Sequence, residues 1–144
     1  MEKSQKRLIL FMPSMDGGGV EKNLIIIGNY LSKVIDSIIL ITFDDKFNKF
    51  FSNKIKIINV QKKNKKKVSK YYKYLRCLLI LTKEILKNRN SSVFSFQANI
   101  YSIILSKIIN FKLIVRSNSS PSGWTKSFLK NYLFKKFFKY PASI

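Results

Sequence analysis

The chain has 144 residues, of which 46% are hydrophobic and 24% are charged. This balance is typical of one globular domain and excludes a disordered or fibrous protein. The sequence contains no histidine and one cysteine, Cys77. Because histidine is the commonest general base and zinc ligand, Ser-His-Asp chemistry and the usual zinc sites are excluded, and we expect no metal. A single cysteine forms no internal disulfide, and we expect Cys77 to be an inert core thiol.

The formal net charge of +21 is compatible with nucleic acid, an anionic membrane or an acidic substrate as a partner. Lysine, isoleucine, asparagine and phenylalanine are abundant together, so nucleotide bias in the coding sequence explains the charge equally well. Only four residues are arginine, the side chain best suited to bidentate phosphate contacts. Lysines are scattered along the chain and the sequence has no DNA- or RNA-binding motif, so we do not expect nucleic acid as a partner.

The first predicted element is a strand over residues 7–12, ended by Pro13. Its apolar run is too short for a signal peptide and no small-residue cleavage site follows. A glycine-rich turn covers residues 14–19. Apolar residues three and four apart then predict a helix with one buried face, formed by Val20, Leu24, Ile27, Leu31 and Val34.

β-branched runs predict a second strand over residues 37–43 and a third over 55–60. A loop with five lysines, residues 61–67, leads into a predicted helix over residues 68–87. We expect its buried stripe to consist of Val68, Tyr71, Tyr72, Leu75, Leu78, Leu79, Ile85 and Leu86.

A fourth strand is predicted over residues 93–96, and an apolar helix, expected to be buried on most sides, over 98–109. A fifth strand over residues 113–115, a polar loop over 117–123 and a helix over 124–138 follow. The sequence ends at Ile144, where a further strand is expected to begin, so we expect a truncated product.

The alternation of strands and helices predicts an α/β domain with a doubly wound, Rossmann-like parallel sheet. Such sheets bind ligands at the carboxyl ends of their strands. Three predicted loops lie there, over residues 14–19, 96–99 and 117–123, and the functional site is expected among them.

The glycine-rich turn is the strongest candidate, because Gly17, Gly18 and Gly19 permit close approach of the backbone to a ligand. Free amides at the start of a helix favour a phosphate or a carboxylate. The turn is not a P-loop, and Lys22 stands where a dinucleotide fingerprint has its third glycine, which disfavours a nucleotide-cofactor domain. Alternatively, the glycines only form a tight turn, with Asp16 or Glu21 serving the helix start.

The segment Pro13-Ser-Met-Asp-Gly-Gly-Gly-Val-Glu-Lys22, followed by Asn29-Tyr-Leu-Ser-Lys33, resembles the opening of family 4 glycosyltransferases of the GT-B fold. The stretches Val93-Phe-Ser-Phe-Gln-Ala-Asn99 and Leu113-Ile-Val-Arg-Ser-Asn118 fit in order and spacing. The resemblance covers nearly the whole chain and identifies it as the N-terminal, acceptor-side domain of such an enzyme.

The resemblance implies transfer of a sugar, with retention, from a nucleotide-sugar to a polysaccharide or glycolipid acceptor, without a metal or other cofactor. It implies a cleft near the donor phosphates and the acceptor, lined by Gly17, Gly18, Gly19, Asn99, Arg116 and Asn118. Many members carry a histidine near the last of these loops, which this sequence lacks, and Arg116 is equally well explained as a surface ion-pair residue. No catalytic residue is assigned.

The family's donor-binding domain, with its Glu-x7-Glu segment, would follow Ile144, so the chain alone is expected to be inactive. We expect a cytoplasmic protein, peripheral at the inner face of the membrane, or alternatively a basic, non-catalytic module that binds anionic membrane or nucleic acid. The alternative to the membrane hypothesis is that the predicted helix over residues 68–87 is an ordinary outer helix with a solvated face. The candidate membrane contacts are Lys62, Lys63, Lys65, Lys66, Lys67, Lys70 and Lys73.

Overall fold

The structure is a computed structural model that describes residues 7–61 and 68–116. The elements follow in the order β1 (Arg7–Phe11), α1 (Gly19–Leu31), β2 (Ser37–Thr42), the 3-10 turn η1 (Asn48–Phe50), β3 (Ile55–Asn59), α2 (Lys70–Lys87), β4 (Ser91–Ser95), α3 (Asn99–Ile109) and β5 (Lys112–Val115). The predicted loop over residues 117–123 and the predicted helix over 124–138 lie outside the described residues.

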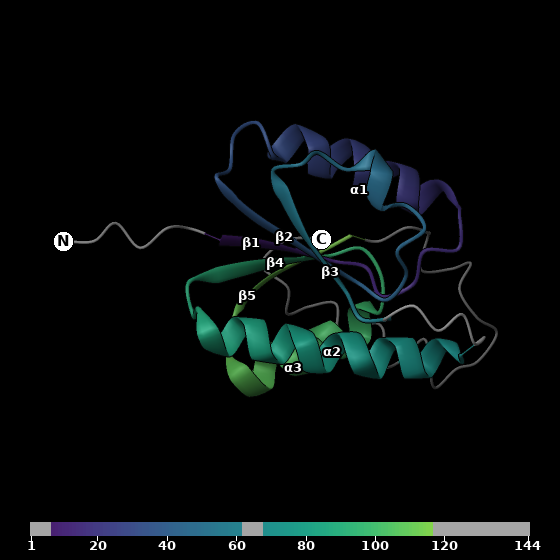
Figure 1. Ribbon diagram of the computed structural model, residues 1–144. Helices are drawn as coiled ribbons and strands as arrows, with labels where there is room; N and C mark the ends of the chain where they lie inside the picture. The colour runs from purple at the N-terminus through teal and green to yellow at the C-terminus, as the bar shows by residue number, and fades with distance from the viewer. Residues whose placement is uncertain (1–6, 62–67, 117–144) are drawn as a thin grey trace.

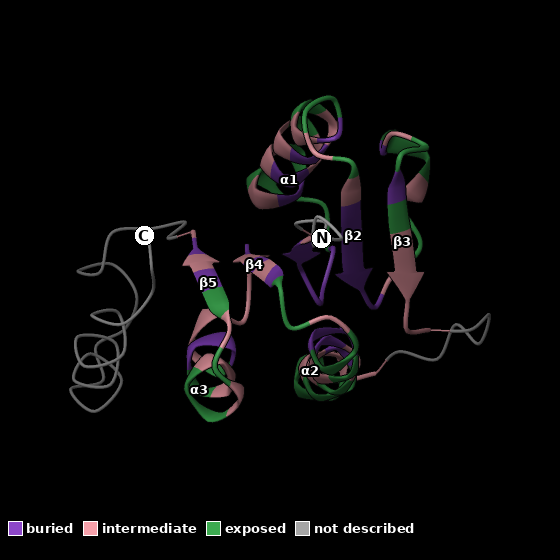
Figure 2. Ribbon diagram, turned by 90° about the vertical axis from the view of Figure 1, so that its left-hand side faces the viewer, coloured by how far each residue is buried: buried purple, intermediate pink, exposed green. Residues whose placement is uncertain are grey.

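The five strands form one parallel sheet in the order β3-β2-β1-β4-β5. Helix α1 covers one face of this sheet, and α2 and α3 cover the other (Figures 1 and 2). The predicted α/β, Rossmann-like doubly wound fold is confirmed. Helices on both faces explain why the inner strands are continuous apolar runs without alternation.

Alternate residues of the inner strands divide the core into two layers. Ile9 and Phe11 of β1 pack toward the α2 and α3 side, together with Ile39 and Ile41 of β2. Their neighbours Leu8 and Leu10 belong to the layer under α1, as do Ile38 and Leu40. The period of two follows from the pleat of a strand.

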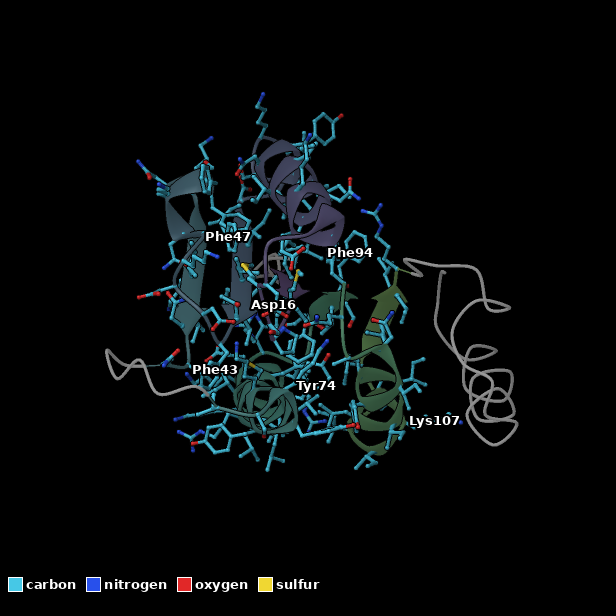
Figure 3. All side chains as sticks on the ribbon, turned by 90° about the vertical axis from the view of Figure 1, so that its right-hand side faces the viewer. Asp16, Phe43, Phe47, Tyr74, Phe94 and Lys107 are labelled. Atoms are coloured by element: carbon cyan, nitrogen blue, oxygen red, sulfur yellow. The ribbon has the colours of Figure 1, made fainter. Side chains whose placement is uncertain are left out.

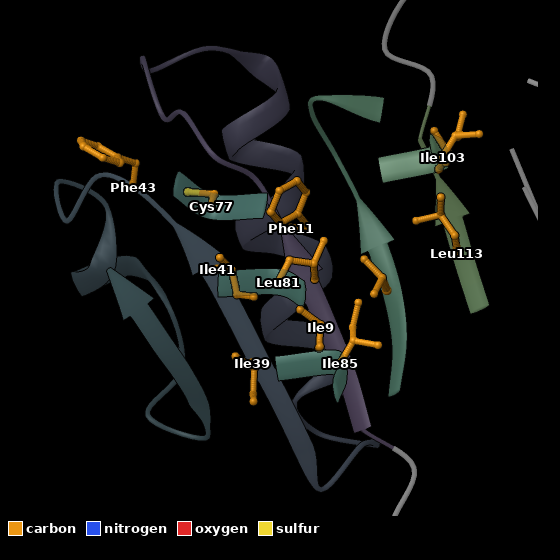
Figure 4. Packing of buried hydrophobic residues seen from close by; sticks show 12 residues of the cluster. Ile9, Phe11, Ile39, Ile41, Phe43, Cys77, Leu81, Ile85, Ile103 and Leu113 are labelled. Carbon is orange, nitrogen blue, oxygen red and sulfur yellow. The ribbon is translucent and has the colours of Figure 1, made fainter. Parts of the chain in front are cut away.

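Helix α2 packs on the sheet through residues spaced four apart. Cys77, Leu81 and Ile85 are fully buried against the inner strands (Figure 4). The expected stripe is therefore wrong in large part: Ile85 is buried, and Val68 and Leu78 are partly buried. The remaining five expected core residues are exposed, namely Tyr71, Tyr72, Leu75, Leu79 and Leu86. The helix has apolar residues on two opposite sides, and only one of them can face the sheet.

Two smaller expectations also need correction. Helix α3 is buried on one side only, through Ser102 and Ile103, whereas Tyr101, Ile104 and Ile108 are exposed. Val34 lies beyond the end of α1 and is exposed rather than part of its buried face. Of the helices that the structure describes, none has the length and hydrophobicity needed to cross a bilayer.

A buried ion cluster fastens α2 to the amino end of β1. The Arg7 guanidinium donates through Nη1 to Glu84 Oε2 (3.1 Å), through Nη2 to the Glu84 carbonyl, and through Nε to Ser91 Oγ (2.9 Å). Lys87 Nζ lies 2.8 Å from the other oxygen of Glu84. Burial alone raises the pKa of Glu84, but the hydrogen bonds and charges of Lys87 and Arg7 outweigh it and lower that pKa below its ordinary value.

The Cys77 thiol is fully buried, and burial raises its pKa to about 12, with the Asp44 charge acting in the same direction. We expect the native chain to react with iodoacetamide at about pH 8 only through unfolding, because thiolate is the reactive form. The urea-unfolded chain should react at the rate of a free thiol. Equal rates for the folded and unfolded chains would place Cys77 at the surface and contradict its assignment to the core.

Candidate functional site

Starting from β1, the chain adds β2 and β3 on one side of the sheet and then β4 and β5 on the other side. The point at which the strand order reverses therefore lies between β1 and β4. In open α/β sheets the crevice for ligands lies at such a point, outside the carboxyl ends of the strands. Two loops meet there: residues 12–18 after β1 and residues 96–98 after β4. Ser14 N donates to Gln97 Oε1 (2.9 Å) and joins the two loops.

The amides of the glycine-rich loop are occupied within the chain. Glu21, in the first turn of α1, accepts hydrogen bonds from the backbone N–H groups of Asp16 (3.0 Å), Gly17 (3.3 Å) and Gly18 (2.8 Å). Its carboxylate therefore lies where the sequence suggested a ligand phosphate or carboxylate. This geometry favours the alternative in which Glu21 serves the helix start.

The glycines themselves have different requirements. Gly17 has a φ of +97°, in the left-handed region that favours glycine. A side chain at Gly18 would come within 3.2 Å of the Glu21 carboxylate, whereas one at Gly19 would meet open space. The backbone at Gly19 is therefore open to a ligand, and its role in lining a cleft stays a prediction, as do those of Gly17 and Gly18.

A hydrogen-bonded cluster surrounds the start of this loop. Ser14 Oγ donates to the Asp16 carboxylate, with both oxygens at 3.2 Å. Met15 N donates to Asp44 Oδ2 at 3.2 Å, and Lys73 Nζ reaches both oxygens of Asp44 at 2.9 Å and lies 3.5 Å from Ser14 Oγ. Asp44, two residues after β2, thus connects that strand to the glycine-rich loop and to α2.

In Figure 3, Asp16 lies between α1 and α2, and Tyr74 lies on α2. Tyr74 packs edge-on against Tyr101 of α3, and the ammonium of Lys70 lies 5.9 Å from the Tyr74 ring. Burial raises the pKa of Tyr74, while the nearby Lys70 acts in the opposite direction. The tyrosine hydroxyl is therefore a neutral hydrogen-bonding group at neutral pH.

The ends of β4 and β5 are held together by Asn99. Its Nδ2 donates to the Arg116 carbonyl (2.8 Å), and its Oδ1 accepts from Ser95 Oγ (3.0 Å). Ala98, the residue before Asn99, has a φ of 58°, in the left-handed region that residues other than glycine seldom adopt. Asn99 thus has a positioning role in the fold at the predicted cleft, and contact with a ligand stays a prediction.

Arg116 lies where the resemblance places it, immediately after β5. Its guanidinium lies 5.9 Å from the Phe96 ring, and its Nη1 is buried without a hydrogen-bond partner. Within the described part of the chain it makes none of the ion pairs that the surface interpretation requires. A buried donor without an acceptor is uncommon in folded proteins and is a candidate contact for an anionic ligand.

Several predicted contacts lie outside the described residues, namely Asn118, Lys62, Lys63, Lys65, Lys66 and Lys67. Lys70 is exposed at the start of α2. Lys73, by contrast, is largely buried by its pairing with Asp44, so its ammonium is directed into the site rather than to a surface. Residues 7–61 and 68–116 contain no cluster of three or more histidine, cysteine, aspartate or glutamate side chains that could hold a metal.

The sequence did not single out Ser14 and Gln97, which the structure brings to the same edge, and it assigned Lys73 to membrane contact rather than to this site. Ser14 and Gln97 each lie a few residues after a predicted strand, so a search for polar residues at strand ends could have found them. A search of strand ends would not have placed Lys73 at this site, because its position on α2 relative to β2 depends on which face of the helix is buried.

No protein-family model matches this sequence, and no curated protein matches it. Among solved structures, the crystal structure of Anabaena Alr3699/HepE in complex with UDP superposes with a TM-score of 0.56 at 18% identity. The alignment covers 92% of this chain and 35% of that one. The chain shares its fold with Alr3699/HepE. The Alr3699/HepE complex with UDP and glucose gives a TM-score of 0.55 at 17% identity, over 92% of this chain and 36% of that one. The chain therefore spans about a third of the length of Alr3699/HepE.

Proposed function

We propose that this chain forms the acceptor-side half of a glycosyltransferase that moves a sugar from a nucleotide-sugar donor to a polysaccharide or glycolipid acceptor, with retention. The observation that carries the proposal is the glycine-rich loop at the switch point of a sheet whose fold matches Alr3699/HepE. That protein binds UDP and glucose, the two parts of a nucleotide-sugar. The sequence resemblance to GT-B glycosyltransferases supports the same class of enzyme.

In this proposal the described residues bind and orient rather than react. The Arg116 guanidinium supplies a buried, unpaired donor for a phosphate oxygen of the donor. The open backbone at Gly19 allows close approach of the substrate. The Ser14–Gln97 hydrogen bond joins the two loops, and Asp44 ties the glycine-rich loop to α2 because it accepts from Met15 N and pairs with Lys73. Loops held in this way lower the entropic cost of orienting a substrate.

We expect UDP-glucose to bind weakly to residues 1–144 and to shift the amide NMR resonances of residues 16–19 and 97–99. Arg116→Ala should weaken this binding about tenfold, the loss of one charge-assisted hydrogen bond. The matched control is Arg89→Ala, which removes the same charge from an exposed arginine. Arg89 precedes β4 and so lies at the amino ends of the strands, away from the candidate site.

Inorganic pyrophosphate is the ligand control, because it carries the phosphates without the nucleoside and the sugar. Equal shifts with pyrophosphate, or equal losses in both arginine variants, would mean unspecific anion binding and would refute the proposal.

A further inference from the structure

One buried serine holds two polar side chains beside each other at the switch point of the sheet. The backbone N–H of Ser14 donates to Gln97 Oε1 (2.9 Å), and the Ser14 hydroxyl lies 3.2 Å from both carboxylate oxygens of Asp16. Ser14 is 2% exposed, whereas Asp16 is exposed and Gln97 is half-buried. The two side chains are therefore fixed from below and open to a ligand from above.

The two groups differ in what they offer a ligand. Because the oxygen of the Gln97 amide accepts from Ser14, its NH2 group is left to donate, and it makes no hydrogen bond within residues 7–61 and 68–116. The Ser14 hydroxyl supplies a single proton, so the Asp16 carboxylate keeps further lone pairs with which to accept. A sugar hydroxyl both donates and accepts. A donor next to a charged acceptor therefore matches two neighbouring hydroxyls of a pyranose.

An aromatic pair borders these polar groups. Tyr74 of α2 packs edge-on against Tyr101 of α3, with 5.9 Å between the ring centroids. Burial is the largest cause of the raised pKa of Tyr74, and the charge of Asp16 acts on it in the same direction, so the two side chains are neighbours (Figure 3). Tyr101 is exposed and Tyr74 is half-buried. Accessible tyrosines suit a sugar, because the ring packs on its C–H face while the hydroxyl forms hydrogen bonds.

Charge restricts the ligand at Asp16 to an uncharged group. No ion pair of the described residues includes Asp16. Lys73 Nζ lies 3.5 Å from Ser14 Oγ, but Asp44 neutralises it at 2.9 Å. The Glu21 carboxylate already occupies the amides of the same loop. A phosphate or carboxylate beside Asp16 would therefore be repelled, whereas hydroxyl groups would not.

We propose that Asp16, Gln97 and Tyr74 form a subsite for an uncharged hexopyranose unit of the acceptor. Asp16 accepts from two neighbouring sugar hydroxyls, the Gln97 amide donates to one of them, and the Tyr74–Tyr101 pair covers the apolar face of the sugar. This inference rests on the proposed function, in which Arg116, after β5, binds the donor phosphate. The subsite lies instead between the loop after β1 and helices α2 and α3. The part of the acceptor that is recognised is then a neutral glycan end, not a phosphate or a lipid.

The test is a titration of residues 1–144 with cellobiose, a disaccharide without charge or lipid, followed by amide NMR. Shifts are expected at residues 14–17 and 97–98. Asp16→Asn should weaken binding about tenfold, because a neutral amide replaces the ionised acceptor of the sugar hydroxyls. The matched control is Asp36→Asn, which removes the same charge from an exposed carboxylate between α1 and β2 and should leave binding unchanged.

A second pair of variants tests the aromatic contact. Tyr101→Leu should weaken cellobiose binding several-fold, whereas Tyr30→Leu, which alters an exposed tyrosine of α1, should not. Glucose 6-phosphate tests the exclusion of charge. Relative to glucose, it should bind more weakly to the unaltered chain and recover in Asp16→Asn, a change that a merely structural role of Asp16 would not produce.

Equal weakening by the two aspartate variants, or no shift with cellobiose, would overturn the subsite. Loss of cellobiose binding in the presence of saturating UDP-glucose would assign the subsite to the donor sugar and overturn its assignment to the acceptor. The proposed function fails separately. UDP-glucose binding that depends on Arg116, without any cellobiose binding, would refute the subsite alone, whereas cellobiose binding through Asp16 without UDP-glucose binding would support the subsite and refute the donor contact.

Discussion

Glu84→Ala is expected to lower the free energy of unfolding by about 3–5 kcal/mol, the largest effect of any substitution considered for this chain. The change leaves the Arg7 guanidinium without its carboxylate partner in a site where the two side chains are 11% and 9% exposed. A buried, uncompensated charge costs far more than the net contribution of the ion pair itself. Urea titration followed by circular dichroism gives the difference directly.

The control is Lys87→Ala, which removes the other partner of Glu84 but from a side chain that is 57% exposed. Its effect should stay below about 1 kcal/mol, as for exposed ion pairs. If both substitutions cost the same, the Arg7–Glu84 pair is not the element that fastens α2 to β1.

The same cluster predicts a dependence on pH. The pKa of Glu84 is lower in the folded chain than its ordinary value of 4.5. The ionised carboxylate therefore stabilises the fold above about pH 4.5, and this contribution is lost as the pH falls through the lowered pKa. The difference in stability between the unaltered chain and Glu84→Gln should be constant near neutral pH and decrease on acidification. An unchanged difference at low pH would contradict this sign.

The sheet was predictable because its signals are local. Each described strand coincides within one or two residues with an apolar or β-branched run, since buried parallel strands need such residues on both faces. The glycines before α1 likewise predicted where this helix begins. Here the local preference of the chain and the final fold agree.

The side of α2 that is buried could not be predicted in this way. Cys77, Leu81 and Ile85 form one apolar stripe, and Leu75, Leu79 and Leu86 form another, so periodicity gives no choice between them. The structure buries the stripe that also brings Glu84 to Arg7 and Lys73 to Asp44. These partners are far apart in the sequence, and no pattern within the helix predicts their pairing.

The sequence predicted where in the fold the candidate site lies, but not the contacts within it. The glycines and Arg116 lie at the strand ends, as the alternation of elements required. The engagement of Glu21 with the loop amides depends on side-chain geometry at the start of α1, for which the sequence offered only an alternative. The same holds for Asn99, whose hydrogen bonds join two strand ends.

Glu21→Ala is expected to have two opposite effects. Stability should fall by about 2 kcal/mol, because a buried carboxylate that accepts three backbone hydrogen bonds is lost, although water can replace it at the exposed amides. Affinity for inorganic phosphate should rise several-fold, because the amides of Asp16, Gly17 and Gly18 become free at the positive end of α1. Urea titration measures the first effect, and a phosphate titration followed by amide NMR shifts measures the second.

The paired outcome separates two roles of the loop. Asp36→Ala, which removes an exposed carboxylate between α1 and β2, controls for the change in net charge and should alter neither quantity appreciably. If Glu21→Ala loses stability without gaining phosphate affinity, the glycines serve only as a tight turn. If phosphate affinity rises, the carboxylate of Glu21 occupies a true anion site, and a donor phosphate would have to displace it or bind beside it at Gly19.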